Sequence, residues 1–139
     1  MLQSFVIDAS VFIASQKESE VKHRTALRFF KHVSERKSEV YLPMLAVYEV
    51  VNNLKRHAHL DSRAMREIAT EMTEADNVTL IPLDMAMLDK TLRLLDHGVS
   101  LKTADLVYVV CAAVTGSTLV TLDKTMAKAA EKIVTVKNL

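Results

Sequence analysis

The segment Phe5–Ile13 constrains the fold most, because it joins a strand without a polar face to a single carboxylate. Phe5, Val6 and Ile7 are all apolar, as in a strand of a parallel sheet that helices cover on both faces. Asp8 then interrupts the apolar run, and two small residues follow it. Ligands of open parallel α/β sheets bind at the carboxyl ends of strands. Asp8 is therefore the first candidate site residue.

Apolar segments of strand length alternate along the chain with segments of helical period. Besides the first strand, we expect strands at 39–42, 78–81, 117–122 and 133–136. We expect helices at about 11–15, 20–37, 44–57, 61–75 and 124–132, one that follows Asp84 and ends at Gly98, and one that begins near Thr103. This alternation predicts a parallel sheet with helices on both faces. With two glycines, two prolines and no repeat, residues 1–139 are expected to form a single domain.

The helical period also predicts which faces are buried. In the helix at 20–37, the core face is expected to hold Val21, Ala26, Leu27, Phe30 and Val33, opposite a solvated basic face of Lys22, Arg24, Arg28, Lys31 and Arg36. In the helix before Gly98, Met87, Leu88, Leu92 and Leu95 are expected to share one face. The first half of the helix at 44–57 is apolar nearly all round, so we expect it to be buried.

Composition limits the partners and the compartment. The formal net charge is only +1, from 18 Lys and Arg against 17 Asp and Glu, so nucleic-acid binding would depend on local basic patches. The single cysteine, Cys111, excludes an internal disulfide and agrees with a reducing compartment. The apolar run at 106–114 is far shorter than the ~18 residues of a membrane span. No basic leader precedes the first apolar residues, so we expect a cytoplasmic protein without a membrane partner.

Four acids interrupt apolar sequence: Asp8, Glu49, Asp105 and Asp123. Two of them follow predicted strands and two lie in apolar helices. If the first and fourth strands are neighbours where the strand order reverses, Asp8 and Asp123 face one crevice, and helices that enter this crevice could present Glu49 and Asp105. Clustered carboxylates repel one another unless cations lie between them, and oxygen ligands favour Mg²⁺ or Mn²⁺. Such a site can activate water and stabilise charge in the cleavage of a phosphodiester.

Each acid also has a structural interpretation when it is taken alone. Asp8 and Asp123 could simply cap the helices that follow them. Asp105 lies in a first helical turn, where the helix dipole favours an acid. Glu49 could pair with a buried Lys or Arg, since an unpaired carboxylate in an apolar helix is costly. The four acids together favour a joint site more strongly than any one of them does.

Four short motifs around these acids resemble those of the PIN domain, particularly its stand-alone form in VapC-type toxins. The motifs are Phe5–Ser10, Pro43–Leu54, Thr103–Ala112 and Leu119–Asp123, and in this order they extend along essentially the whole chain. The resemblance implies a Rossmann-like three-layer α/β/α sandwich with a central, mostly parallel sheet of about five strands. It also implies that the four acids bind Mg²⁺ or Mn²⁺ and that Ser10 and Thr121 support the site. Lys124–Met126 departs from the family, which often has acidic and aromatic residues there.

The same resemblance implies a metal-dependent endoribonuclease that cleaves single-stranded or structured RNA. A toxin of this kind would form a homodimer and bind a small antitoxin that blocks its site. The alternative is a catalytically inactive PIN-like module that binds RNA or protein, although such a module has no physical reason to keep crowded carboxylates. A phosphatase with Asp8 as nucleophile is less favoured because position 10 is Ser. Dinucleotide binding is also disfavoured, because the chain lacks a Gly-x-Gly-x-x-Gly pattern.

Four basic residues are further candidates for contact with RNA phosphates: Lys55, Arg56, Lys102 and Lys124. The first two follow the apolar half of the Glu49 helix, and the other two lie close in sequence to Asp105 and Asp123. Solvation of a helix end and of the surface is the alternative for all four. The nearby His57 and His59 are two positions apart, so they do not share a helix face and are poor joint metal ligands.

Overall fold

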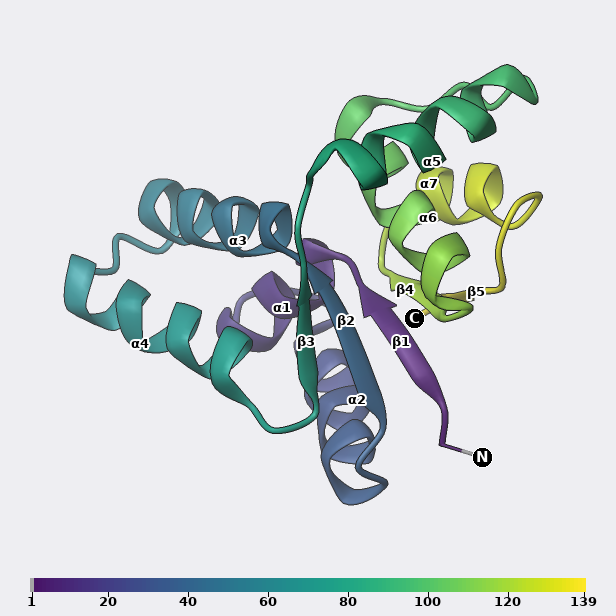
Figure 1. The fold of residues 1–139 in the computed structure, drawn as a ribbon. Coiled ribbons are helices and arrows are strands. Elements are labelled where there is room, and N and C mark those ends of the chain that lie inside the picture. Colours follow the sequence, from purple (N-terminus) through teal and green to yellow (C-terminus); the bar gives the residue numbers. More distant parts are fainter. Residues whose placement is uncertain (1) are drawn as a thin grey trace.

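A computed structural model describes residues 2–139, and its centre is one five-stranded sheet in the order β3-β2-β1-β4-β5 (Figure 1). The strands are β1 Ser4–Ile7, β2 Glu39–Pro43, β3 Val78–Ile81, β4 Thr118–Thr121 and β5 Val136–Asn138. In the described part of the chain, seven helices connect them: α1 Ala9–Gln16, α2 His23–Glu35, α3 Met44–His57, α4 Ser62–Glu74, α5 Met85–Asp96, α6 Thr103–Thr115 and α7 Lys124–Ala130. Every strand pair is parallel, so the predicted three-layer α/β fold is confirmed.

Alternate strand residues enter two apolar clusters on opposite faces of the sheet, as the period of two requires. Phe5 and Ile7 pack with side chains of α1 and α2. Val6 packs instead with side chains of α3, α6 and α7. Because β1 contributes buried residues to both clusters, its apolar sequence without a polar face is explained.

The strand order reverses beside β1, which has β2 on one side and β4 on the other. The β1–β4 register pairs Ile7 with Val120. The N–H of Asp8 continues this pairing by donating to the Val120 carbonyl over 2.9 Å. The residues that follow β1 and β4 therefore lie side by side at the topological switch point, where ligands of such sheets bind.

Several predicted helix starts are confirmed by their caps. The Asp61 side chain accepts from the Ala64 N–H over 2.8 Å, and the Asp84 side chain accepts from the Met87 N–H over 2.9 Å. The last predicted strand is displaced and begins at Val136. The reason is that the N–H groups of Ile133 and Val134 both donate to the Ala130 carbonyl and continue the turn after α7.

The predicted core face of α2 is only partly correct. The buried residues of the helix are Ala26, Phe29 and Val33. Val21 is 96% exposed because it lies in the turn before the helix, where the helical period does not apply. Leu27 is 46% exposed. The helix therefore meets the sheet through a face that contains Phe29, which the sequence pattern did not single out.

Two other helices leave apolar side chains at the surface, and for α3 this contradicts the expected burial. On α3, Tyr48 is 68% and Met44 is 39% exposed, so the first half of this helix is not buried all round. On α5, Met87 is buried but Leu88, Leu92 and Leu95 are more than two fifths exposed. Because α5 packs on α6 through another face, its strongest apolar row remains uncovered. None of the helices in the described part of the chain has the length and hydrophobicity that a membrane crossing requires.

Candidate active site

Asp8 is held by two hydroxyl groups at the switch point. Its Oδ2 atom accepts from Ser10 Oγ over 2.7 Å and from Thr121 Oγ1 over 2.8 Å. Each hydroxyl in turn accepts a backbone N–H, from Leu122 at 3.2 Å and from Asp123 at 3.0 Å. Because a hydroxyl has one proton, these contacts fix the direction in which it donates. Within residues 2–139, both side-chain hydrogen bonds of Asp8 involve Oδ2, and Oδ1 has no hydrogen-bond partner.

Glu49 is held by Tyr108, a residue that the sequence reasoning missed. The Tyr108 hydroxyl donates to Glu49 Oε1 over 2.7 Å and accepts the Ala9 N–H over 3.2 Å. Tyr108 is only 1% exposed, and a buried tyrosine hydroxyl generally requires a partner. None of the ion pairs found in the described residues includes Glu49. The alternative of a buried Lys or Arg partner is therefore wrong, and a neutral donor orients the carboxylate instead.

The capping interpretation is correct for Asp123 and wrong for Asp8. Asp123 Oδ1 accepts from the N–H groups of Thr125 and Met126, over 2.9 and 3.1 Å, and begins α7. Asp8 stands at the start of α1 but its side chain makes no capping bond there. Asp105 lies in the first turn of α6, as the dipole interpretation expected, and is half-buried. The exposed Asp123 still has its second oxygen available beyond the cap.

The four acids share one electrostatic environment. Burial raises the pKa of Glu49, and repulsion from Asp8 and Asp105 raises it further, against the hydrogen bond from Tyr108. Burial likewise raises the pKa of Asp105, with repulsion from Asp123 and Asp8 added. Elements far apart in the sequence therefore bring all four carboxylates close enough to repel one another.

The sequence model of the PIN domain family matches residues 5–132. The chain belongs to the PIN domain family. No curated protein sequence matches the chain, but several solved structures share its fold. VapC20 of Mycobacterium tuberculosis, described as a sarcin-ricin loop cleaving toxin, is 16% identical with a TM-score of 0.69, and the match covers 90% of this chain and 94% of that one.

Two further structures show the same fold. FitAcB of Neisseria gonorrhoeae is 18% identical with a TM-score of 0.65, and the match covers 96% of both chains. PAE2754 of Pyrobaculum aerophilum is 22% identical with a TM-score of 0.63, over 96% of this chain and 83% of that one. At these identities the likeness concerns the fold, so the chemistry of this PIN domain has to be argued from its own residues.

The donor set of this PIN domain fits a hard divalent cation that keeps part of its water. All four candidates are carboxylates, the ligand type that Mg²⁺ and Mn²⁺ prefer. In residues 2–139, no three Asp, Glu, His or Cys side chains converge into a ready-made metal cage. Mg²⁺ usually binds through one or two carboxylates and retains several waters. An open set of carboxylates that repel one another therefore suits such a cation better than a cage that encloses it completely.

The basic candidates occupy different positions around the PIN-domain acids. Lys102 lies near enough to Asp105 for its charge to oppose the rise in the pKa of that carboxyl. Lys124 is exposed and directly follows Asp123 at the start of α7. Lys55 and Arg56 are exposed in the last turn of α3. Arg56 is seven positions, about two turns, beyond Glu49 and so shares its side of the helix, whereas Lys55 does not.

The raised pKa values predict how the stability of the metal-free PIN domain depends on pH. Glu49 and Asp105 have pKa values above their ordinary 4.5 and 3.8 in the folded chain. The contribution of these two carboxyls to stability is therefore fully present when the pH is below their pKa values in the unfolded chain. It is lost as the pH rises through their higher pKa values in the folded chain. We expect Glu49→Gln to stabilise the protein in EDTA at pH 7 more than at pH 4, as measured by urea unfolding. Glu74→Gln, at an exposed position on α4, is the control, and an equal effect of Glu49→Gln at both pH values would refute the prediction.

Proposed function

We propose that this PIN domain is a Mg²⁺- or Mn²⁺-dependent endoribonuclease that cleaves phosphodiester bonds of RNA. The observation that carries the proposal is the group of four carboxylates at the switch point, which repel one another. Hydroxyl groups orient two of them, Asp8 and Glu49, and none of the four takes part in an ion pair within the described residues. Keeping such a group folded costs stability, and a bound cation removes that cost. The VapC-type fold adds the expectation of a cytoplasmic toxin that acts on single-stranded or structured RNA.

The roles of the residues follow from their contacts. Asp8 would hold the cation through its unbonded Oδ1, and Glu49, Asp105 and Asp123 would complete the set directly or through water. When bound, the cation supplies Lewis-acid polarisation of a phosphate oxygen and activation of water. Ser10 and Thr121 keep the Asp8 carboxylate in one orientation. At the edge of the site, Lys102 and Lys124 would bind the phosphates of the RNA strand.

A nuclease assay separates the enzyme from an inactive binding module. Purified protein is incubated with end-labelled, mixed-sequence single-stranded RNA in Mn²⁺, Mg²⁺ or EDTA, and with single-stranded DNA of the same sequence. We expect cuts in RNA that require the cation and that EDTA abolishes. Folded protein that binds Mn²⁺ and RNA but leaves the RNA intact would favour the inactive module instead.

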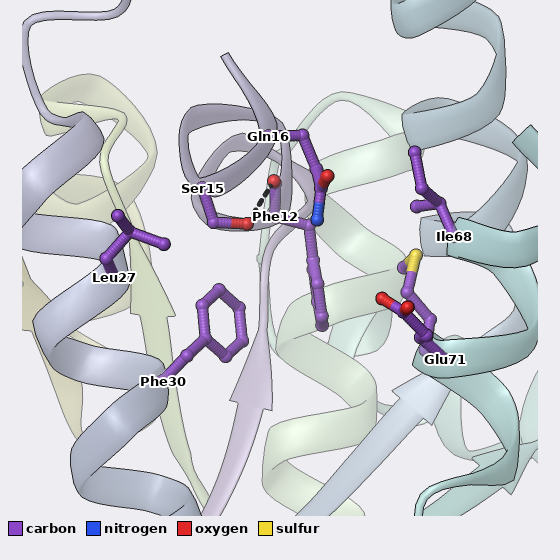
Figure 2. Close-up of a pocket in the computed structure, with 8 residues that line it drawn as sticks. Phe12, Ser15, Gln16, Leu27, Phe30, Ile68 and Glu71 are labelled. Atoms are coloured by element: carbon purple, nitrogen blue, oxygen red, sulfur yellow. Dashed lines mark hydrogen bonds between the residues drawn. The ribbon is translucent and has the colours of Figure 1, made fainter. Parts of the chain in front are cut away.

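The VapC-type resemblance implies an antitoxin partner, and we further propose that this partner binds the cleft between α1, α2 and α4. Figure 2 shows Phe12 and Phe30 on one side of this cleft and Ile68 on the other. The cleft has a volume of about 240 Å³, and the Glu71 carboxylate stands at its edge. Structures with this fold include VapBC and FitAB complexes. An apolar side chain beside a basic one would fit the cleft and its acidic edge.

The uncovered apolar row on α5 supports the proposed homodimer. Leu88 and Leu92 lie four positions apart on one side of the helix and are 44% and 47% exposed. Met85, one turn before Leu88, is 70% exposed. A two-fold contact uses the same surface patch on both chains, and a row of large aliphatic side chains along one helix is a suitable patch.

We expect Leu88→Asp to shift a dimer toward monomers. A charge in the centre of an apolar interface is expected to weaken association by more than about 30-fold, or about 2 kcal/mol. Analytical ultracentrifugation over a range of protein concentrations measures the shift, and Asp89→Asn provides a control at the adjacent position. Wild-type protein that stays monomeric at high concentration, or an unchanged dimer in Leu88→Asp, would rule out this interface.

A further inference from the structure

The outer surface of α2 has a local excess of positive charge that the candidate active site does not use. Residues 22–37 contain six Lys and Arg and a single acid, Glu35, in a chain whose net charge is +1. All six basic side chains are exposed: Lys22, Arg24, Arg28, Lys31, Arg36 and Lys37. The rest of the chain holds 12 Lys and Arg against 16 Asp and Glu and is therefore net acidic, so the excess of positive charge lies on this helix and its two ends.

Three of these six basic residues form a row along α2, and all but one of the six make no ion pair within the described residues. Arg24, Arg28 and Lys31 follow one another at spacings of four and three residues, which places them along one side of the helix. Among the ion pairs in residues 2–139, only Lys31 of this set takes part, with Glu35 at 3.7 Å. Lys137 from β5 is not part of this row, because its Nζ atom lies 5.6 Å from the ring of Phe29, on the side of α2 that faces the sheet.

A merely solvated helix surface has a different charge pattern, and α4 of the same chain provides the comparison. That helix carries Arg63 and Arg66 together with three glutamates. One of its arginines pairs with Glu67 at 3.4 Å. Mixed signs with pairs at four positions are typical of a helix that needs only solubility. The one-sided charge of α2 is instead typical of a surface that meets a polyanion.

The α2 surface is connected to the acid site through α1. Helix α1 begins directly after Asp8, and six residues later the carbonyl of Ala14 is 2.7 Å from Nδ1 of His23, the first residue of α2. Six helical residues span about 9 Å, so the basic row begins close to the carboxylates. Figure 1 shows α2 continuing from α1 along the side of the sheet, away from the strand ends where the acids lie.

We infer that the outer surface of α2 binds the phosphate backbone of the RNA on one side of the cleavage site. The inference rests on the proposed function, because it takes RNA as the polyanion. Arg24 and Arg28 offer guanidinium groups, which bind phosphate oxygens through two parallel hydrogen bonds. Their spacing of four residues, about 6 Å along the helix axis, allows them to contact separate phosphates. The contact carries no sequence information, and it favours long RNA over short RNA.

Salt-dependent RNA binding tests the inference without requiring cleavage. The affinity of a fluorescein-labelled 20-nucleotide single-stranded RNA is measured by anisotropy in EDTA from 0.05 to 0.5 M NaCl. Arg24→Gln/Arg28→Gln is compared with wild type and with Lys90→Gln/Arg93→Gln, which removes the same charge from α5. Two lost phosphate contacts reduce the slope of log K against log salt by about 1.4. This corresponds to about 25-fold weaker binding at 0.1 M NaCl if the affinities converge at 1 M. The α5 pair is expected to bind as wild type does.

The outcomes separate this inference from the proposed function. An unchanged salt slope in Arg24→Gln/Arg28→Gln, or an equal loss in the α5 pair, would overturn the inference, even if a six-nucleotide RNA is still cleaved. Loss of antitoxin binding with unchanged RNA binding would also overturn it and would assign the surface to an acidic protein. Wild-type protein that binds the 20-mer through α2 but never cleaves RNA would sustain the inference and refute the nuclease.

Discussion

Asp8→Asn is expected to abolish metal-dependent RNA cleavage while it stabilises the metal-free protein. The Asn carbonyl oxygen can still accept from Ser10 and Thr121, so the local geometry is retained. The negative charge at the centre of the four acids is lost, which removes repulsion from Glu49 and Asp105. Loss of a direct ligand should weaken Mn²⁺ binding by more than about 100-fold, since even outer hydrogen-bond partners contribute 10- to 100-fold.

This prediction is specific because Asp8→Asn should lower the affinity for Mn²⁺ and at the same time raise the stability of the metal-free protein. Calorimetric titration with Mn²⁺ measures the affinity, and thermal unfolding in EDTA measures the stability. Asp76→Asn is the control, because this exposed acid precedes β3 and so lies at the amino end of the sheet, opposite the site. If Asp8→Asn destabilises the metal-free protein and leaves Mn²⁺ binding unchanged, Asp8 has a purely structural role.

Tyr108→Phe is expected to lower Mn²⁺ affinity and cleavage by about 10- to 100-fold, because Tyr108 is a positioning residue for Glu49. The substitution keeps the buried ring and removes only the hydroxyl that donates to Glu49 Oε1 and accepts the Ala9 N–H. The free energy of unfolding should fall by about 1–2 kcal/mol, since these groups lose a buried partner.

If Tyr108 had only a structural role, Tyr108→Phe would lower stability without changing Mn²⁺ affinity or the rate of cleavage. The decisive readouts are therefore the Mn²⁺ affinity and the division of the rate loss between kcat and KM. We expect kcat to fall while the KM for long RNA stays near that of wild type, because the phenol does not touch the substrate surface proposed on α2. Tyr41→Phe serves as the control, since Tyr41 bonds only to its neighbour Glu39 at the surface. Wild-type Mn²⁺ affinity in Tyr108→Phe would show that Glu49 needs no fixed donor.

The parts of the fold that depend on local sequence were predictable. The alternation of strands and helices, the helix starts at Asp61 and Asp84, and the end of the first strand just before Asp8 are each encoded within a few neighbouring residues. The order β3-β2-β1-β4-β5 was not predicted, because the pairing of strands depends on contacts between segments far apart in the sequence. The adjacency of β1 and β4 was only a condition for the predicted crevice, and the structure meets this condition.

Features that depend on the partner of a side chain were not predictable. Tyr108 reads as one more apolar residue of α6, because its partner Glu49 is 59 positions away. Of the two hydroxyls that orient Asp8, that of Ser10 is two positions away, but that of Thr121 is 113 positions away, and only the resemblance to the PIN domain indicated its role. On α5, the helical period identified an apolar row but could not show that the helix would pack on α6 through another face. Periodicity reports that a surface is apolar, and packing alone decides what covers it.

Anomalous diffraction from crystals soaked in Mn²⁺ is the measurement that most directly tests whether the four carboxylates hold a cation. We predict a manganese peak within coordination distance of Asp8 Oδ1, with Glu49, Asp105 and Asp123 bound to it directly or through water. The Tyr108 and Thr121 hydroxyls should keep their bonds to the carboxylates. Manganese that binds only at other surfaces, with no peak beside Asp8 at saturating concentration, would contradict the metal site and with it the proposed nuclease.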